Sequence, residues 1–373
     1  MSKSPLRILQ LISSCGFFGA EKVVFELASE LTKAGHLVTI GVIKNQQYPD
    51  FDLTEKAANA SLKSHGFQCR GKLDFKTVAA LASYARENSI DIIHSHGYKA
   101  DIYAFLSGLK HRVPLVATTH NWININTKMS FYALADKAIL KKFDAVIPVS
   151  RTVETLLLQS GFRKERVHLV ENGVNIENFH RNHSHMSTSA IPYDRQYKIV
   201  GTIGRLVKEK GHSHLLDAAA TVLASWKNCI FVFVGDGPLK ESLQQQANEH
   251  AIGDKVMFLG NRDDIPELLS RMDIFVLPSL VESHPMALLE AMAAQKAIVA
   301  SGVGDVANIL KDGHSGRVVP PGSSSSIAEG VLSYLNNPDE AMRHGLNAYH
   351  EAVEKYSSTR MANEYLESYG RLN

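Results

Sequence analysis

The chain has 373 residues, which at roughly 150 residues per domain suggests about two domains. Its 40 basic and 38 acidic residues leave a formal charge of +2, and 45% of residues are hydrophobic against 21% charged. This balance excludes collagen-like, disordered and strongly nucleic-acid-seeking chains. Cys15, Cys69 and Cys229 lie far apart without a C-x-x-C spacing, which supports neither a disulfide framework nor a zinc site.

The N-terminal segment MSKSPLRILQLISS has few apolar positions and no small-residue cleavage site, so we interpret it as a first β-strand rather than a signal peptide. No apolar run approaches the roughly 20 residues that cross a bilayer. The sequence therefore predicts a cytoplasmic protein that is soluble or at most peripheral at the inner face of the plasma membrane.

In the first half, short β-branched runs alternate with stretches of helical period, which is typical of parallel sheets with crossover helices. A strand at 7–12, a helix at 20–35 and a strand at 36–43 form one βαβ unit. Further strands are predicted at 90–96, 114–120, 145–150 and 167–172, with helices at 75–88, 98–109, 129–142 and 151–160.

The polar stretch 179–196 interrupts this pattern and is the best linker candidate. After it, strands are predicted at 198–204, 229–235, 256–260, 274–279, 297–301 and 317–320, with helices at 211–226, 238–250, 264–270 and 285–294. Only helices are predicted from about 324 to 371, and the last of them is long enough to pack back onto the first domain.

The alternation predicts an α/β protein with two doubly wound, Rossmann-like domains facing across a cleft. We place the first domain at 1–190, the second at 191–355 and the returning C-terminal helix at 356–373. Because ligands of open α/β sheets bind at the carboxyl ends of the strands, we expect functional residues in the strand-to-helix loops.

Glu282 and Glu290, eight residues apart in LVESHPMALLEAMA, give the strongest local signal. Glu282 lies in a loop, Glu290 lies inside the next helix, and Pro285 suits the first helical turn. The backbone N–H groups of Met286 and Ala287 at this helix N-terminus favour an anionic or hydroxyl-rich ligand, while the two carboxylates can accept hydrogen bonds from sugar hydroxyls. Two solvated surface charges are the alternative.

A second signal is the basic loop GRLVKEKG (204–211), which follows a strand. Arg205 can bind phosphate oxygens through two parallel hydrogen bonds and Lys210 as a point charge, so together they can neutralise a diphosphate. An ordinary surface loop with incidental cations is the alternative.

A third signal is the loop SSCGFFGAEKVV (13–24), in which Gly16 and Gly19 allow the backbone to approach a ligand. The loop lacks the G-x-G-x-x-G spacing, and VGDGPLK (234–240), which contains Gly235, lacks its third glycine. A nicotinamide dinucleotide site and hydride transfer are therefore disfavoured.

These motifs together resemble the retaining nucleotide-sugar glycosyltransferases of family GT4, which have the GT-B fold. The resemblance covers nearly the whole chain: Glu282 to Glu290 is similar to the family's E-x7-E motif, and GRLVKEKG to its G-R-x-x-x-x-K-G segment. Further landmarks follow in order at GFFGAEKVV (16–24), HSHG (94–97), TTHN (118–121) and ENGVN (171–175).

The resemblance implies roles for individual residues. Arg205 and Lys210 would hold the donor diphosphate, Glu290 the ribose hydroxyls, and Glu282 would face the donor hexose. The remaining implied donor-site residues are His120 beside the hexose, Gly16 and Gly19 near the phosphates and acceptor, Asn261 and Arg262 near the nucleobase, and Gly235, Met286 and Ala287.

Two departures from the family pattern affect these expectations. Ser283, His284 and Pro285 stand where the family often has Gly-Phe-Gly, and residues 304–308 replace its usual Gly-Gly and Pro-Glu loop. The donor sugar therefore stays open, and no role is carried over for the second loop.

A cation pair beside the leaving diphosphate, without a D-x-D sequence at a strand end, predicts that no metal or other cofactor is needed. The retention that the resemblance implies would proceed through an oxocarbenium-like transition state. His94 and His96, which flank Ser95, are expected to point to opposite faces of their strand. The His-rich stretch 180–185 is a weak candidate for metal binding because it has no partner Cys or carboxylate cluster.

The expected reaction moves a hexose from a nucleoside diphosphate sugar, UDP favoured, to a saccharide or lipid-linked acceptor in polysaccharide or lipopolysaccharide biosynthesis. The basic, partly apolar segment 128–145 suggests contact with an anionic membrane surface, with ordinary packing on its own sheet as the alternative. No nucleic acid partner is expected. A sugar-nucleotide epimerase of the same fold and a non-catalytic sugar-nucleotide-binding subunit stay open as alternative functions.

Overall fold

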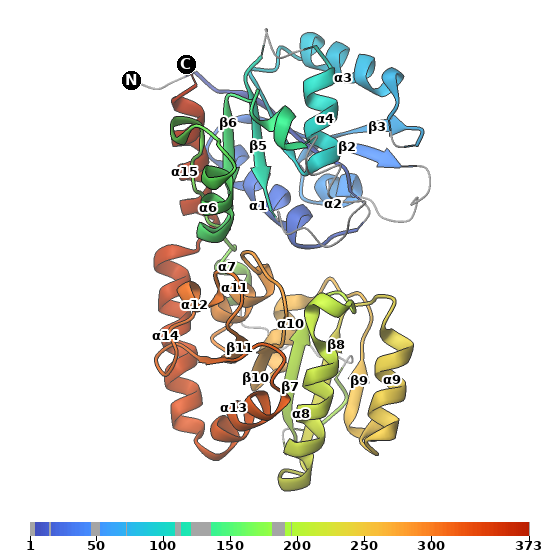
Figure 1. The fold of residues 1–373 in the computed structure, drawn as a ribbon, viewed down its shortest axis with the longest axis vertical. Coiled ribbons are helices and arrows are strands. Elements are labelled where there is room, and N and C mark those ends of the chain that lie inside the picture. Colours follow the sequence, from blue (N-terminus) through green and yellow to red (C-terminus); the bar gives the residue numbers. More distant parts are fainter. Residues whose placement is uncertain are drawn as a thin grey trace. The chain divides into compact units, whose positions relative to one another are not determined.

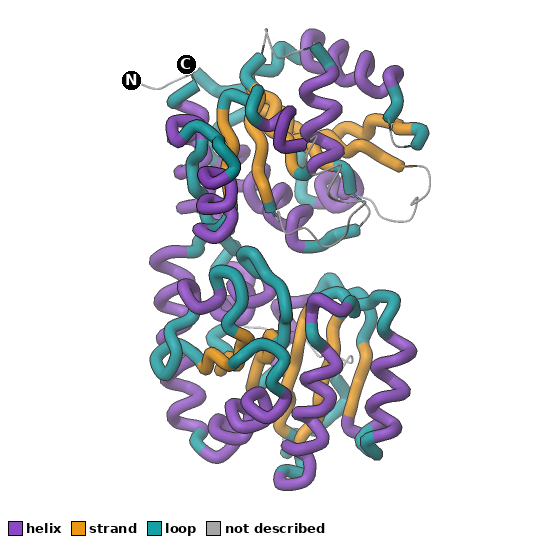
Figure 2. Tube along the Cα trace, in the orientation of Figure 1, coloured by secondary structure: helices purple, strands orange, loops and turns teal. Residues whose placement is uncertain are grey.

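The computed structural model describes residues 4–14, 16–45, 53–71, 73–108, 113–120, 136–180, 191–194 and 196–372. The chain divides into two compact units (Figure 1). Unit 1 comprises residues 1–173 together with 358–373, and unit 2 comprises residues 174–357. Each unit contains its own six-stranded parallel sheet between helices, drawn orange and purple in Figure 2.

Unit 1 has the strand order β3-β2-β1-β4-β5-β6, with every neighbouring pair parallel. The winding direction reverses between β1 and β4, so ligand-binding loops are expected at their carboxyl ends. The elements of this unit are β1 (Arg7–Ile12), α1 (Gly19–Lys33), β2 (Leu37–Asn45), α2 (Leu53–Asn59), β3 (Lys63–Cys69), α3 (Phe75–Glu87), β4 (Ile92–His96), α4 (Tyr98–Leu106), β5 (Leu115–Thr119), β6 (Ala145–Pro148), α6 (Arg151–Gln159) and α15 (Ser358–Gly370).

The central strands of unit 1 are buried on both faces, as parallel sheets require. On one face Leu9, Ile93 and Leu115 pack with apolar side chains of α3, α4 and α6. On the other face α15 packs beside α1 and its tyrosines reach β4 and β5. Figure 1 shows α15, in red, against the blue and green elements of this unit.

Unit 2 repeats this winding, with the order β12-β11-β10-β7-β8-β9 and the reversal between β7 and β10. Its core includes Phe231, Phe233 and Val276, which pack with α8 and α13. The elements are α7 (Glu177–His180), β7 (Lys198–Ile203), α8 (His212–Ser225), β8 (Cys229–Val234), α9 (Lys240–Glu249), β9 (Val256–Phe258), α10 (Ile265–Arg271), β10 (Ile274–Leu277), α11 (Met286–Ala293), β11 (Ala297–Ser301), α12 (Val306–Ile309), β12 (Arg317–Val319), α13 (Ser324–Asn336) and α14 (Pro338–Lys355), with 3-10 turns η4 (Lys208–Lys210) here and η2 (Lys164–Arg166) in unit 1.

The chain passes between the units at residues 173/174 and 357/358, whereas the sequence analysis places the boundaries at 190/191 and 355/356. Unit 2 begins earlier because the backbone N–H of Val174 donates to Tyr356 O at 2.8 Å and Val174 forms a β-bridge with Ser357. Of the expected linker 179–196, residues 181–190 and 195 lie outside the described residues.

Two local differences have a simple physical reason. The sequence analysis missed α2 and β3, because the edge strand KSHGFQC has no β-branched run and is largely open to solvent. The expected strand 167–172 is an irregular segment that lies along β6, where the N–H of His168 donates to Val146 O and the N–H of Val170 to Pro148 O.

The described helices include none that is both long and apolar enough to cross a bilayer. Of the basic segment 128–145, residues 128–135 lie outside the described residues, whereas 136–140 are helical and 141–145 lead into β6.

Candidate active site

In unit 2 the loops after β7 and β10 meet at the point where the winding reverses. Lys210 Nζ lies 2.6 Å from Glu282 Oε1, and the Ser279 hydroxyl donates to the same oxygen at 2.7 Å. The side chain of Glu282 is 8% exposed and that of Lys210 is 25% exposed. Glu282 and Lys210 are therefore members of one partly buried polar cluster rather than solvated surface charges.

Backbone contacts hold these two loops in register. The carbonyl of Glu209 accepts hydrogen bonds from the N–H groups of Leu280 at 2.8 Å and Val281 at 3.2 Å. Gly211 has φ of 63°, and a Cβ there would lie 2.1 Å from Pro278 O, so only glycine allows this approach. The sequence motif GRLVKEKG thus ends on a glycine because the second loop presses against it.

Glu290 lies in α11, which starts directly after Pro285. Its side chain is 5% exposed, so the alternative of a solvated helix charge is wrong for this residue as well. Met286 and Ala287 are the first two residues of α11, and backbone N–H groups at such positions have no partner inside the helix. Helix α11 and the loop before it therefore supply backbone N–H donors and two buried carboxylates.

Arg205 is exposed, and its backbone carbonyl lies 3.1 Å from His212 Nε2 at the start of α8. Burial lowers the pKa of His212 to about 4, so this histidine is neutral near pH 7 and its Nε2–H can donate to the carbonyl. His212 therefore positions the backbone of Arg205. The sequence analysis did not single out His212, because a histidine at a helix start carries no distinctive spacing.

The loops after β8 and β9 lie toward the edge of the same sheet. The N–H of Gly235 donates to Gly260 O at 2.8 Å, and a Cβ on Gly235 would lie 2.0 Å from Gly204 O. Asn261 is exposed, and Arg262 donates two hydrogen bonds to Asp264 at 2.8 and 2.6 Å. Gly235 thus adjoins the loop that carries Arg205, whereas the guanidinium of Arg262 already has a carboxylate partner.

In unit 1 the loop after β1 is organised by Glu21, which is 7% exposed. Its carboxylate accepts hydrogen bonds from the Ser14 hydroxyl and from the N–H of Phe18, both at 3.1 Å. Gly16 is buried, and a Cβ there would overlap the Phe18 ring. Gly19 is exposed as the first residue of α1, so its backbone is accessible as the sequence analysis requires.

Three histidines form a stack at the carboxyl ends of β4 and β5. The ring centroids of His94 and His96 are 4.3 Å apart, and His96 stacks on His120 at 5.4 Å. The expectation that His94 and His96 point to opposite faces is wrong, because residues two apart in a strand share a face. Ser95 is the residue on the other face, where its hydroxyl donates to the Asp101 carboxylate.

The hydrogen bonds of Gln10 determine which atoms donate and which accept at His96 and His120. Gln10 Nε2 donates to Tyr369 OH at 3.3 Å, and Gln10 Oε1 lies 2.6 Å from His96 Nε2, which must therefore donate. His96 Nδ1 then accepts, so the proton shared with His120 at 3.1 Å belongs to His120 Nε2. The network assigns His120 the tautomer in which Nδ1 keeps its lone pair.

Two tyrosines of α15 close the other end of the network. Tyr369 OH lies 2.7 Å from His94 Nδ1, and Thr118 Oγ1 lies 2.7 Å from His94 Nε2 and 2.9 Å from Tyr365 OH. Burial, with smaller contributions from neighbouring histidines, lowers the pKa of His94 to about 3 and that of His96 well below its usual value. Burial alone lowers the pKa of His120 to about 4.

The stack is therefore neutral near pH 7. Gln10, Tyr365 and Tyr369 lie outside every motif of the sequence analysis, because hydrogen-bonded partners this far apart in the chain leave no spacing signal. Among the described residues, no group of three or more His, Cys, Asp or Glu side chains is arranged to hold a metal ion.

The fold and the site geometry together define a class of protein. Two doubly wound units with this strand order form the GT-B fold, and the chain aligns with the crystal structure of Anabaena Alr3699/HepE at a TM-score of 0.83 and 21% identity, covering 98% of this chain and 99% of HepE.

The family follows from sequence comparison. The model of glycosyl transferases group 1 matches residues 189–351, and the model of glycosyltransferase family 4 matches residues 18–178. The putative glycosyltransferase EpsF of Bacillus subtilis is 36% identical over 308 residues, covering 79% of this chain and 78% of EpsF. The uncharacterized glycosyltransferase MJ1607 of Methanocaldococcus jannaschii is 30% identical over 297 residues, covering 75% of each chain. The chain belongs to glycosyltransferase family 4.

Proposed function

We propose that this glycosyltransferase moves a hexose from a nucleoside diphosphate sugar, preferably a UDP-sugar, to a saccharide or lipid-linked acceptor, with retention of configuration and without a metal or other cofactor. The observation that carries the proposal is the partly buried pair of Lys210 and Glu282 at the winding reversal of unit 2. This is where open α/β sheets bind their ligands.

The donor site follows from the charges around this pair. Lys210 and the exposed Arg205 supply two cations for the diphosphate, and the N–H groups at the start of α11 supply further donors for anionic or hydroxyl groups. The buried Glu290 is assigned to the ribose hydroxyls. HepE has been crystallised with UDP and with UDP-glucose, which supports UDP as the leaving group here.

During transfer, negative charge grows on the departing diphosphate as the glycosidic bond breaks. Arg205 and Lys210 stabilise that charge, and Glu282 keeps Lys210 oriented before the donor arrives. The acceptor hydroxyl attacks the face from which the diphosphate leaves, and a departing phosphate oxygen takes its proton. For His120 of unit 1 we propose a contact with a sugar hydroxyl, which the Nδ1 lone pair of the neutral ring can accept.

The acceptor class is proposed from the names of relatives. One is an Escherichia coli galactosyltransferase acting on α-D-GlcNAc-diphosphoundecaprenol, and another is the phosphatidyl-myo-inositol mannosyltransferase of Mycobacterium leprae. We place this chain likewise in cell-surface glycan biosynthesis, in the cytoplasm with peripheral contact at the inner membrane face. Co-sedimentation with anionic vesicles at low salt tests that contact, which is abandoned if the protein stays in the supernatant.

The first experiment measures thermal unfolding with UDP, GDP and ADP, each with and without EDTA. A nucleotide at 100 times its dissociation constant adds about 2.7 kcal/mol of stability. We expect UDP to raise the unfolding temperature, with or without EDTA. Lys210→Ala should reduce this shift, whereas Lys208→Ala, which changes an exposed lysine in the same turn, should retain it. No shift with any nucleotide would overturn the donor site.

Turnover separates the three candidate functions. By analogy with oxyanion donors, Arg205→Ala and Lys210→Ala should each lower transfer by about 10² to 10³-fold. Nucleotide binding without transfer across a broad acceptor panel would instead favour the non-catalytic binding subunit. Interconversion of UDP-sugars without an acceptor would favour the epimerase.

A further inference from the structure

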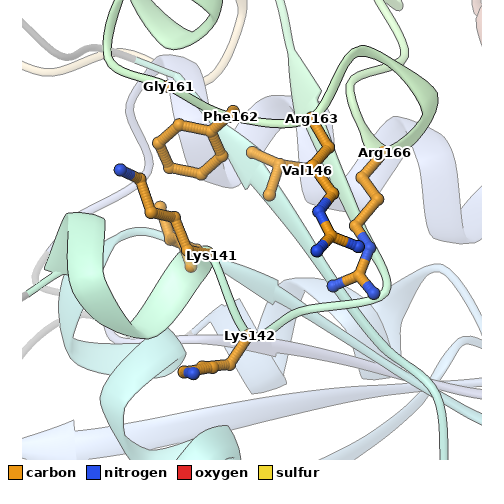
Figure 3. Close-up of a pocket in the computed structure, with 8 residues that line it drawn as sticks. Lys141, Lys142, Val146, Gly161, Phe162, Arg163 and Arg166 are labelled. Atoms are coloured by element: carbon orange, nitrogen blue, oxygen red, sulfur yellow. The ribbon is translucent and has the colours of Figure 1, made fainter.

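A pocket of about 480 Å³ lies in unit 1, away from the strand ends that carry His96 and His120 (Figure 3). It is formed at the amino end of β6, where the turn after helical residues 136–140 meets the segment between α6 and η2. Its lining residues are Leu140, Lys141, Lys142, Val146, Gly161, Phe162, Arg163 and Arg166. Because all strands of this sheet are parallel, the pocket lies at the end of the sheet opposite to the carboxyl ends of β4 and β5, where the histidine stack lies.

Four of the eight lining residues are cationic, although the whole chain carries a formal charge of only +2. Figure 3 shows Lys141 and Lys142 on one side of the pocket and Arg163 and Arg166 on the other. Lys141, Lys142 and Arg163 are exposed and Arg166 is half-buried. Positive groups thus approach one space from two separate segments of the chain.

Two of these side chains are held in place by the protein. Arg166 Nη1 donates to Phe143 O at 3.0 Å, which anchors the guanidinium. Lys141 Nζ lies 5.6 Å from the centroid of the Phe162 ring, a cation–π distance. Gly161 has φ of 77°, a backbone conformation that favours glycine, and a Cβ there would make only an ordinary contact of 3.5 Å with Lys141 Nζ.

Carboxylates of the described residues do not neutralise these four cations. Within the described ranges, no Asp or Glu lies within ion-pair distance of any of the four cations. The nearby Asp144 carboxylate accepts the N–H of Leu115 at 2.9 Å. Residues 109–112 and 121–135, which lie outside the described ranges, contain no acidic residue in their sequence.

We propose that this pocket binds a ligand that bears at least two phosphate charges. Arginine forks and lysine ammonium groups are the side chains that recognise phosphate oxygens, and Phe162, Leu140 and Val146 give the organic part an apolar wall. The phosphate group belongs either to a lipid headgroup or to a free phosphorylated compound. The site is separate from the donor site of the proposed function and does not depend on it.

Calorimetric titration with inorganic pyrophosphate tests the pocket. Arg163→Gln should weaken binding by about tenfold, the effect of one charge-assisted hydrogen bond, and Lys142→Gln should act similarly. Lys164→Gln is the matched control, because it removes the same charge from the neighbouring exposed residue, which does not line the pocket. Arg205→Ala, at the donor site of unit 2, should leave this binding component unchanged.

The proposed phosphate site is contradicted if Arg163→Gln leaves pyrophosphate binding unchanged while Arg205→Ala abolishes it. It is also contradicted if Arg163→Gln and Lys164→Gln weaken pyrophosphate binding equally. Vesicles of phosphatidylcholine with and without phosphatidic acid identify the source. A lipid headgroup is supported if the protein floats with the phosphatidic acid vesicles, if Arg163→Gln abolishes this flotation, and if Lys164→Gln retains it. Pyrophosphate binding without flotation supports a free phosphorylated compound.

Discussion

At the scale of residues, the sequence predicts which side chains form the candidate site. It does not predict that these side chains are buried. Residue spacing selected Glu282, Glu290, Arg205 and Lys210 but left solvated charges as an alternative. Burial depends on how two loops 72 residues apart approach each other, as in the bond from Lys210 to Glu282, and such contacts have no local pattern in the sequence.

The first prediction concerns this ion pair. Lys210→Met should lower the free energy of unfolding by about 2 kcal/mol, because it leaves a buried carboxylate with the Ser279 hydroxyl alone. Glu282→Gln added to Lys210→Met should recover part of that loss. Urea unfolding of Lys210→Met, Glu282→Gln and the double variant measures the coupling, with Lys208→Met, which changes an exposed lysine, as the control. Strictly additive effects of the two substitutions would contradict it.

A second prediction follows from the neutral histidines of unit 1. Their folded pKa values, about 3 for His94 and about 4 for His120, lie below the usual 6.5, so the unfolded chain binds more protons between these values. The free energy of unfolding should therefore fall as the pH drops from about 6.5 toward 4, by up to about 1.4 kcal/mol per pH unit for each histidine. Stability from this source is fully present only above pH 6.5.

Urea unfolding at a series of pH values measures this slope. His120→Asn should reduce the slope of the free energy of unfolding against pH by the contribution of about one proton. His350→Gln, which alters an exposed histidine, is the control and should give the slope of the unchanged protein. Identical slopes for all three proteins would show that His120 does not stay neutral in the folded state.

At the scale of elements, helical spacing in TRMANEYLESYGRL predicts α15, but not what its tyrosines bind. Tyr369 OH reaches His94, 275 residues earlier, and Tyr365 OH reaches Thr118, 247 residues earlier. The polar edge strand β3 is the reverse case: it has no periodic pattern in its sequence and is a strand because it pairs with β2. Helices with one apolar face are thus more predictable than edge strands or long-range polar contacts.

The third prediction tests the link between α15 and β4. Tyr369→Phe should cost about 1 to 3 kcal/mol of stability, because the buried Nδ1 of His94 loses its hydrogen-bond partner while the ring volume hardly changes. Tyr197→Phe is the control, since no hydrogen bond of its hydroxyl is found in the described part of the chain, and its effect should stay within about 0.5 kcal/mol. Equal effects of the two substitutions, measured by chemical unfolding, would contradict a role for the hydroxyl.

At the scale of the whole molecule, the sequence predicts two doubly wound domains, and the strand orders confirm this fold class. Alternation of strand and helix suffices for this because each βαβ unit follows the same right-handed rule. The boundary between the units depends instead on the β-bridge between Val174 and Ser357, which joins the first and last residues of unit 2.

The fourth prediction is that a chain ending at Ser357 keeps unit 2 folded and loses unit 1. Met361, Tyr365 and Tyr369 are buried in unit 1, and their removal costs on the order of 5 kcal/mol, comparable with the stability of a whole domain. Differential scanning calorimetry should show one remaining transition, whereas a chain ending at Gly370 should behave as the full chain. Two transitions in the shorter chain would contradict this.

The return of the chain to unit 1 sets an order of events during synthesis on the ribosome. Residues 358–370 leave the exit tunnel only after all of unit 2, so for most of translation the face of the first sheet that α15 covers has no partner. Unit 2 is continuous and can fold as soon as it emerges. The nascent first unit is therefore the part of this protein that most needs protection by chaperones until its last helix arrives.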